Sequence, residues 1–312
     1  MNRRQFIIGS GAAGGALLLP RPAAAHVATP HLPHGGVNTH LSFWNTPYSD
    51  AARMADKLLA LETKLCRDSW APPGQSSAWY DRWNQAVLRC RDVAGVKWVW
   101  YLPGGYTASQ LNYYLDGMES AKAANVLAGI EPPNEPDLNG LSDAQIIEGQ
   151  QMLYEAVKAR PALRSYLVWG PATYKSTARR IGSLGAYMDV GGWHIYFRER
   201  PIDTWGFNDA YDAARTLSGG KRLIPTEANF IIGDGFPNLA DRAGEREQLL
   251  GYEDMQTGFS QLGIDRVFCY ELFNGSDPKF ASTHRENNFG CFRSDGSAKP
   301  LSNAVLAANR RG

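Results

Sequence analysis

Two glutamate residues have the placement that acid–base chemistry requires. Glu135 lies in the stretch GIEPPNEPD, residues 129–137, which follows the apolar residues VLA. The prolines exclude a helix and disfavour a central strand, so this stretch predicts a strand end that breaks into a stiff turn. Glu227 lies in LIPTEANF, residues 223–230, where an apolar segment again gives way to a loop. Hydrolysis of a glycosidic bond needs two such carboxyl groups, one to donate a proton and one to attack or to position water.

The elements that would hold these residues alternate along the chain. Apolar residues spaced three and four apart predict helices, for example over 52–62, 78–93 and 143–159. Short apolar runs predict eight strands, at 36–43, 63–70, 96–102, 126–132, 165–171, 190–197, 222–230 and 265–273. Eight strands with intervening helices indicate an α/β fold, a single-domain (β/α)8 TIM barrel, with a doubly wound open sheet as the alternative. In a barrel the carboxyl ends of strands four and seven face each other, so Glu135 and Glu227 would bracket a scissile bond.

The N-terminal residues predict export. Arg3 and Arg4 precede a modest apolar run at 6–19 and the small residues Ala23–Ala25. This is the pattern of a twin-arginine signal cleaved after Ala25, and the run is too short to span a bilayer; a retained anchor is the alternative. A GxGxxG match at 9–14 lies inside this signal and lacks the strand and helix that a dinucleotide site needs. We therefore expect a signal at 1–25, a tether at 26–35, a barrel at 36–312, and a periplasmic or secreted protein.

Composition and motifs limit the partners. The net charge of +1 gives no bias toward nucleic acid or membranes, and 44% hydrophobic residues are ample for a core. No CxxC, HExxH or EF-hand spacing occurs, so we expect neither a metal nor a cofactor. The only partner we expect is a poly- or oligosaccharide substrate, bound by a monomer that does not engage a membrane once the signal is removed. The four cysteines could form the bridges Cys66–Cys90 and Cys269–Cys291, or they could be four buried free thiols.

The motifs around the two glutamates resemble those of the retaining glycoside hydrolases of clan A, the 4/7 barrels. The sequence Asn134-Glu135-Pro136 after strand four and Glu227 at the end of strand seven carry the resemblance. It covers about residues 36–310, includes the tail NFGCFRSDGSAKPLSNAVL (288–306), and in detail is similar to families 39 and 5. The resemblance implies that Glu135 is the acid/base, that Glu227 is the nucleophile, and that Asn134 holds the sugar 2-hydroxyl.

The resemblance also implies sugar contacts at other strand ends. Arg67 of CRDSW would lie beside the nucleophile, and His194 and Tyr196 of WHIY would contact the sugar and the nucleophile. Strand alternation independently places His194 and Tyr196 on one face. The clan usually has a Trp at the end of strand eight; here Phe273 would replace it, unless the register is off by a residue or two. Glu271, two residues earlier, is expected to pair with Arg67.

Further contacts are expected from aromatic and polar residues near the mouth, because sugar faces stack on aromatic rings. These residues are His40, Trp44, Trp70 and Trp205. Glu131 lies inside strand four and is expected to be structural. The predicted function is a retaining endo-β-glycosidase acting on a β-linked polysaccharide, cellulose-like or an exopolysaccharide. The alternatives are an exo-acting β-glycosidase, an inactive secreted carbohydrate-binding barrel, and a redox enzyme. The retaining mechanism predicts carboxyl groups ~5–5.5 Å apart.

Overall fold

Eight parallel strands form a closed ring, which confirms the predicted (β/α)8 barrel. The computed structural model describes residues 34–43, 46–71, 77–197, 206–232, 242–275 and 284–311. The strands pair in the order β5-β4-β3-β2-β1-β8-β7-β6, and the parallel bridge between Trp169 and Val190 joins the two ends of this series. The strands are β1 (His34–Asn38), β2 (Leu65–Ser69), β3 (Lys97–Tyr101), β4 (Leu127–Glu131), β5 (Leu167–Val168), β6 (Gly191–Phe197), β7 (Leu223–Phe230) and β8 (Arg266–Cys269).

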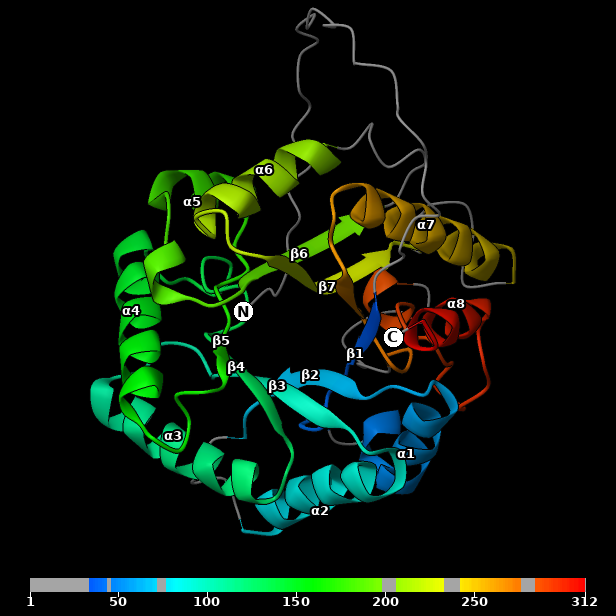
Figure 1. The fold of residues 1–312 in the computed structure, drawn as a ribbon. Helices are drawn as coiled ribbons and strands as arrows, with labels where there is room; N and C mark the ends of the chain where they lie inside the picture. The colour runs from blue at the N-terminus through cyan, green and yellow to red at the C-terminus, as the bar shows by residue number, and fades with distance from the viewer. Residues whose placement is uncertain are drawn as a thin grey trace, which may run out of the picture.

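Helices surround the strands (Figure 1). The three helices predicted over 52–62, 78–93 and 143–159 are confirmed. Ser142 is the N-cap of the helix over 143–159 and forms a capping box with Gln145. No described helix is long and apolar enough to cross a membrane. The helices are α1 (Ala51–Ala60), α2 (Ser77–Ala94), α3 (Ala108–Ala123), α4 (Asp143–Ala159), α5 (Lys175–Ile181), α6 (Phe207–Leu217), α7 (Arg242–Gln261) and α8 (Pro300–Asn309).

Two apolar layers hold the barrel together. The inner layer gathers residues of several strands and strand ends, namely Val99, Trp169, Val190, Ile224 and Phe268. This layer is tight, because a Cβ atom on Gly36 of β1 would lie 2.6 Å from the ring of Phe268. The outer layer lies between the strands and the helices and includes stacked indole rings of Trp98 and Trp100. The packed interior leaves only the carboxyl ends of the strands for a polar site.

Three details differ from the sequence prediction or complete it. β1 begins at His34, two residues earlier than predicted, so the last two residues of the predicted tether belong to the strand. β8 ends at Cys269, four residues earlier than predicted, and the peptide bond between Tyr270 and Glu271 is cis. All four cysteines are buried free thiols, with the Sγ atoms of Cys269 and Cys291 3.7 Å apart.

Candidate active site

Glu135 stands at the tip of the loop that follows β4. Its φ angle is +42°, in the left-handed region that costs a residue with a Cβ atom roughly 1–2 kcal/mol. Asn139 holds the turn in this shape, because its side-chain amide donates to the carbonyl oxygens of Asn134 at 2.7 Å and of Glu135 at 3.1 Å. The Glu135 side chain is 9% exposed. The proline-rich turn predicted from the sequence therefore serves to aim one carboxyl group into the mouth of the barrel.

Glu227 lies on β7 with both carboxylate oxygens held by the protein. Nη1 of Arg67 donates to Oε1 at 2.8 Å, and the hydroxyl of Tyr196 donates to Oε2. The Glu227 side chain is 3% exposed. A buried carboxylate that is fixed at both oxygens has one orientation, and the positive guanidinium offsets part of its charge.

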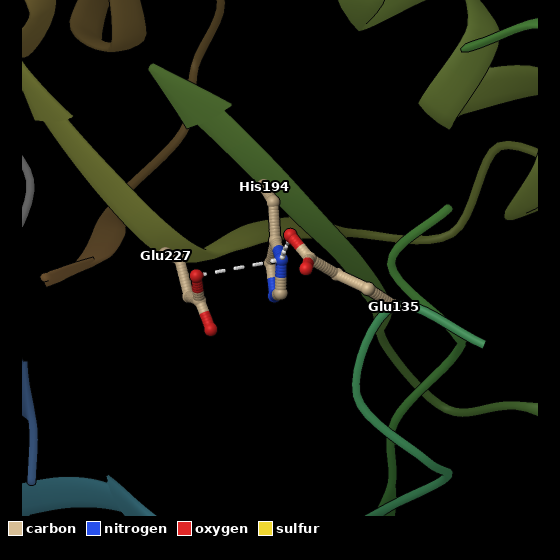
Figure 2. A group of neighbouring side chains, drawn as sticks. All are labelled: Glu135, His194 and Glu227. Atoms are coloured by element: carbon tan, nitrogen blue, oxygen red, sulfur yellow. Dashed lines mark hydrogen bonds and ion pairs between the residues drawn. The ribbon is translucent and has the colours of Figure 1, made fainter. Parts of the chain in front are cut away.

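His194 of β6 lies between the two glutamates (Figure 2). Its Nδ1 atom is 3.0 Å from Oε1 of Glu135 and 3.6 Å from Oε2 of Glu227. One oxygen of each glutamate and one His194 nitrogen all lie within 4.8 Å of one another. Glu135, His194 and Glu227, which come from the loop after β4, from β6 and from β7, therefore meet at one place.

Arg67 of β2 is the centre of a buried hydrogen-bond network beneath this group. Glu131 accepts from Nε at 2.6 Å and from Nη2 at 3.0 Å, in the two-pronged geometry that favours Arg. Asn134 accepts from Nη2 at 2.7 Å, and Asn38 of β1 accepts from Nη1 at 3.1 Å. Burial lowers the pKa of Arg67, but Glu131 and Glu227 outweigh it and raise that pKa above its usual range. Glu131 thus has the structural role predicted for it, as the second anchor of Arg67.

The expected pairing of Glu271 with Arg67 is wrong. Glu271 instead accepts a hydrogen bond from the hydroxyl of Tyr48 at 2.9 Å and lies 3.0 Å from Nε2 of His40. Burial lowers the pKa of His40, but the carboxylates of Glu271, Asp68 and Glu227, Glu271 foremost, together raise it by more, so the net shift is upward. The ring of His40 stacks on the half-exposed ring of Phe43 at 4.5 Å. The predicted contact residue His40 therefore belongs to a second polar network, formed with Tyr48 and Glu271.

Two aromatic residues expected at the site lie in the core instead. Phe273 is fully buried against Tyr48 and Phe292, because β8 ends at Cys269 and the chain has already turned into the core. Trp70 is 3% exposed and packs edge-on against other indole rings between the strands and the helices. The other two indoles expected to contact sugar, Trp44 and Trp205, lie outside the described residues.

Tyr270, and not Phe273, lies beside Tyr196, the residue that holds Glu227. It is the first residue after β8, and its ring centroid is 5.9 Å from that of Tyr196 and 5.4 Å from that of His40. The strand predicted over 265–273 ends four residues too late to indicate this tyrosine. A strand that ends at Cys269 would have pointed to Tyr270 as the aromatic residue at the mouth.

A cavity of about 340 Å³ opens beside the glutamates. Glu135, His194 and Tyr196 line it, together with Thr173 and Tyr174 from the segment that leads into α5. The oxygens of Glu135 and Glu227 and the nitrogen of His194 also have the composition and spacing to hold a metal ion. The hydrogen bonds described above account for their proximity without one. The arrangement provides two carboxyl groups at close range next to a space that a ligand can enter.

Comparisons with known proteins identify the fold. No family model matches the sequence, and no curated protein matches it. An active-site mutant of a β-1,3-glucanosyltransferase from Rhizomucor miehei, solved with laminaritriose, is similar over 88% of this chain and 97% of its own, with 15% identity and a TM-score of 0.60. An endo-laminarinase from Formosa is similar over 89% of this chain and 87% of its own, with 13% identity and a TM-score of 0.59.

A β-glucuronidase from Bacteroides uniformis is similar over 88% of this chain, with 15% identity and a TM-score of 0.65. This chain spans only 35% of that enzyme. At such identities the likeness shows the fold alone, a TIM barrel. It does not distinguish families 39 and 5, which stay a prediction.

Proposed function

We propose that this protein is a retaining endo-β-glycosidase, with Glu227 as the nucleophile and Glu135 as the acid/base. One observation carries the proposal: carboxylate oxygens of Glu135, in the loop after β4, and of Glu227, on β7, lie within 4.8 Å of each other. Retaining enzymes keep their carboxyl groups about 5–5.5 Å apart, whereas inverting enzymes leave about 6.5–9.5 Å for a water molecule. The observed spacing supports the retaining alternative.

The reaction would proceed in two displacements. In the first, a Glu227 oxygen attacks the anomeric carbon while Glu135 gives its proton to the glycosidic oxygen, so that a glycosyl ester forms and the leaving sugar departs. In the second, Glu135 takes a proton from water, the water oxygen attacks the anomeric carbon, and the ester bond to Glu227 breaks. Each carboxyl group ends the cycle in the protonation state in which it began.

The surrounding residues fit these roles. Arg67 and Tyr196 fix both oxygens of Glu227, which aligns the nucleophile and limits its motion. Arg67 also occupies Oδ1 of Asn134, which turns the amide N–H donors of Asn134 to the substrate, as a contact to the sugar 2-hydroxyl requires. His194 contacts Glu135 through Nδ1 and would orient it toward the glycosidic oxygen.

A covalent intermediate is the direct test. The protein is incubated with a panel of 2-deoxy-2-fluoro-β-glycosyl fluorides, and its intact mass is measured. We expect a mass increase that maps to the peptide containing Glu227, and none in the Glu227→Gln variant, which should retain its circular dichroism spectrum and melting temperature. The Glu148→Gln variant, altered at an exposed position of α4, serves as a control and should label like the wild type. An adduct on a different carboxylate would reassign the nucleophile, and α-anomers as first products would exclude retention.

The proposal specifies the type of bond that is cleaved, a β-glycosidic bond. The named neighbours include enzymes of β-1,3-glucans and β-glucuronides, so the first substrates to test are laminarin, β-1,4-glucans, β-1,4-xylan and aryl β-glycosides, glucuronides among them. Internal cleavage would give a ladder of oligosaccharides from the polymer. Release of single sugars from one chain end would replace the endo-acting proposal with the exo-acting one.

We further propose that the enzyme acts outside the cytoplasm as a monomer. The twin arginine and the Ala23–Ala25 run support export. Replacing Arg3 and Arg4 together by Lys should leave the protein in the cytoplasmic fraction. Equal export of this variant would contradict the twin-arginine route.

A further inference from the structure

The cavity beside Glu135 lies on one side of the carboxylate pair. Glu135, His194 and Tyr196 belong to its lining, but Glu227 does not. In a double displacement the nucleophile approaches the anomeric carbon, while the acid/base contacts the glycosidic oxygen and therefore adjoins the departing sugar. The cavity thus occupies the leaving-group side of the scissile bond. Its volume of about 340 Å³ is sufficient for a small ligand.

Two polar atoms of the lining are buried and lack partners. Oγ1 of Thr173 and Nε2 of His194 have no hydrogen-bond partner within the part of the chain that the structure describes. Leaving buried polar atoms unpaired is costly, so such atoms call for a ligand or water that completes them. His194 is only 7% exposed, and because Nδ1 already contacts Glu135, Nε2 is the atom that a ligand can use. Both atoms suit the hydroxyl groups of a sugar, which donate and accept.

An exposed aromatic ring completes the cavity wall. Tyr174 carries a large aromatic ring, yet the residue is 43% exposed. Its backbone N–H donates to Oδ2 of Asp137 at 2.9 Å, which ties its segment to the loop that carries Glu135. The backbone that carries the ring is therefore fixed relative to the loop of the acid/base. An aromatic face next to unpaired polar atoms is the combination that holds a sugar ring.

We propose that this cavity is the subsite for the leaving-group sugar, with Tyr174 stacking on the ring and Thr173 and His194 binding its hydroxyls. The inference rests on the proposed function for its orientation along the glycan. It names the residues that would determine which sugar the enzyme accepts as the leaving group. In the second displacement the same subsite would hold an acceptor sugar, whose hydroxyl replaces water and gives its proton to Glu135.

Binding to an inactive variant tests the subsite without relying on turnover. The Glu227→Gln variant is titrated calorimetrically with laminarihexaose, cellohexaose and xylohexaose. Adding Tyr174→Ala should weaken the tightest of these complexes about 3- to 10-fold, the loss expected for one aromatic stacking contact. Adding Thr173→Val, which removes only the hydroxyl, should weaken it several-fold. Tyr113→Ala is the matched control, because Tyr113 is also a half-exposed tyrosine (50%) but lies on α3, and binding should not change.

The outcomes separate this inference from the proposed function. Unchanged affinity in both Tyr174→Ala and Thr173→Val, with folding verified by circular dichroism, would overturn the subsite, as would the absence of binding by every oligosaccharide. Tyr174-dependent binding together with a wild-type protein that cleaves nothing would leave the subsite standing and refute only the hydrolase. In an active enzyme, Tyr174→Ala should lower kcat/KM for the hexasaccharide about 3- to 10-fold, whereas Tyr113→Ala should leave it unchanged.

Discussion

The backbone at Glu135 is left-handed, so glycine should fit this position better than alanine. Glu135 has φ = +42°, and a Cβ atom in this region costs roughly 1–2 kcal/mol. Ala keeps that cost, whereas Gly avoids it but loses about 0.5–1 kcal/mol through the greater freedom of its unfolded chain. Both substitutions remove the same contact with His194. We therefore expect Glu135→Gly to be more stable than Glu135→Ala by about 0.5–1 kcal/mol, although neither variant should have normal activity.

Thermal and urea unfolding of the two variants measure this difference. For a domain of this size about 1 kcal/mol corresponds to a shift in melting temperature of about 2 °C. The matched control is Glu148, an exposed residue inside α4, where Gly should be less stable than Ala by about 1 kcal/mol. The expected order of Gly and Ala is thus opposite at the two positions. If Glu135→Ala is as stable as Glu135→Gly, the turn does not impose the left-handed conformation and the reasoning fails.

Three other perturbations follow from the buried groups. Glu131→Ala leaves the buried Arg67 without its two-pronged partner, so the free energy of unfolding in urea should fall by about 3–5 kcal/mol and activity should fall as well. The control, Glu155→Ala on the exposed face of α4, should change neither. Asp68 of β2 is buried and accepts hydrogen bonds from the Thr39 hydroxyl and the Leu41 backbone N–H. Burial raises its pKa from 3.8 to about 6, so the stability that this group contributes is fully present below about pH 4 and is lost as the pH rises through 6. The loss is on the order of 3 kcal/mol, and Asp68→Asn should flatten this slope. No thiol should react with Ellman's reagent before unfolding, since all four are buried; rapid labelling of the native protein would contradict this packing.

The sequence predicted the barrel and the meeting of the two carboxylates because both depend on order along the chain. Eight alternating elements leave few arrangements, and residues at strand ends then fall on the same rim. Glu135 and Glu227, from strands four and seven, could be placed together without knowing any side-chain rotamer. Alternation within a strand also predicted that His194 and Tyr196 share a face, and both contact the glutamates in the structure.

The errors concern residues whose positions depend on where a strand stops. β8 ends four residues earlier than predicted, which moves Tyr270 to the mouth and Phe273 into the core. Trp70 could have been placed correctly, because alternation from the inward Arg67 puts residue 70 on the outer face. The partner of Glu271 could not, since it depends on Tyr48, which reaches the site from outside the strands.

The contacts of Arg67 also constrain when in folding the active site can exist. Its side-chain partners Asn38, Glu131, Asn134 and Glu227 are 29, 64, 67 and 160 residues away in the chain. A chain segment that ends just after Asn134 contains Asn38, Glu131 and Asn134, and it could form most of the hydrogen bonds to the guanidinium. The last partner, the proposed nucleophile, arrives only when β7 joins the ring. Contacts of such long separation form late because the intervening chain must first be ordered. Regain of activity during refolding should therefore report closure of the barrel, whereas secondary structure should return earlier.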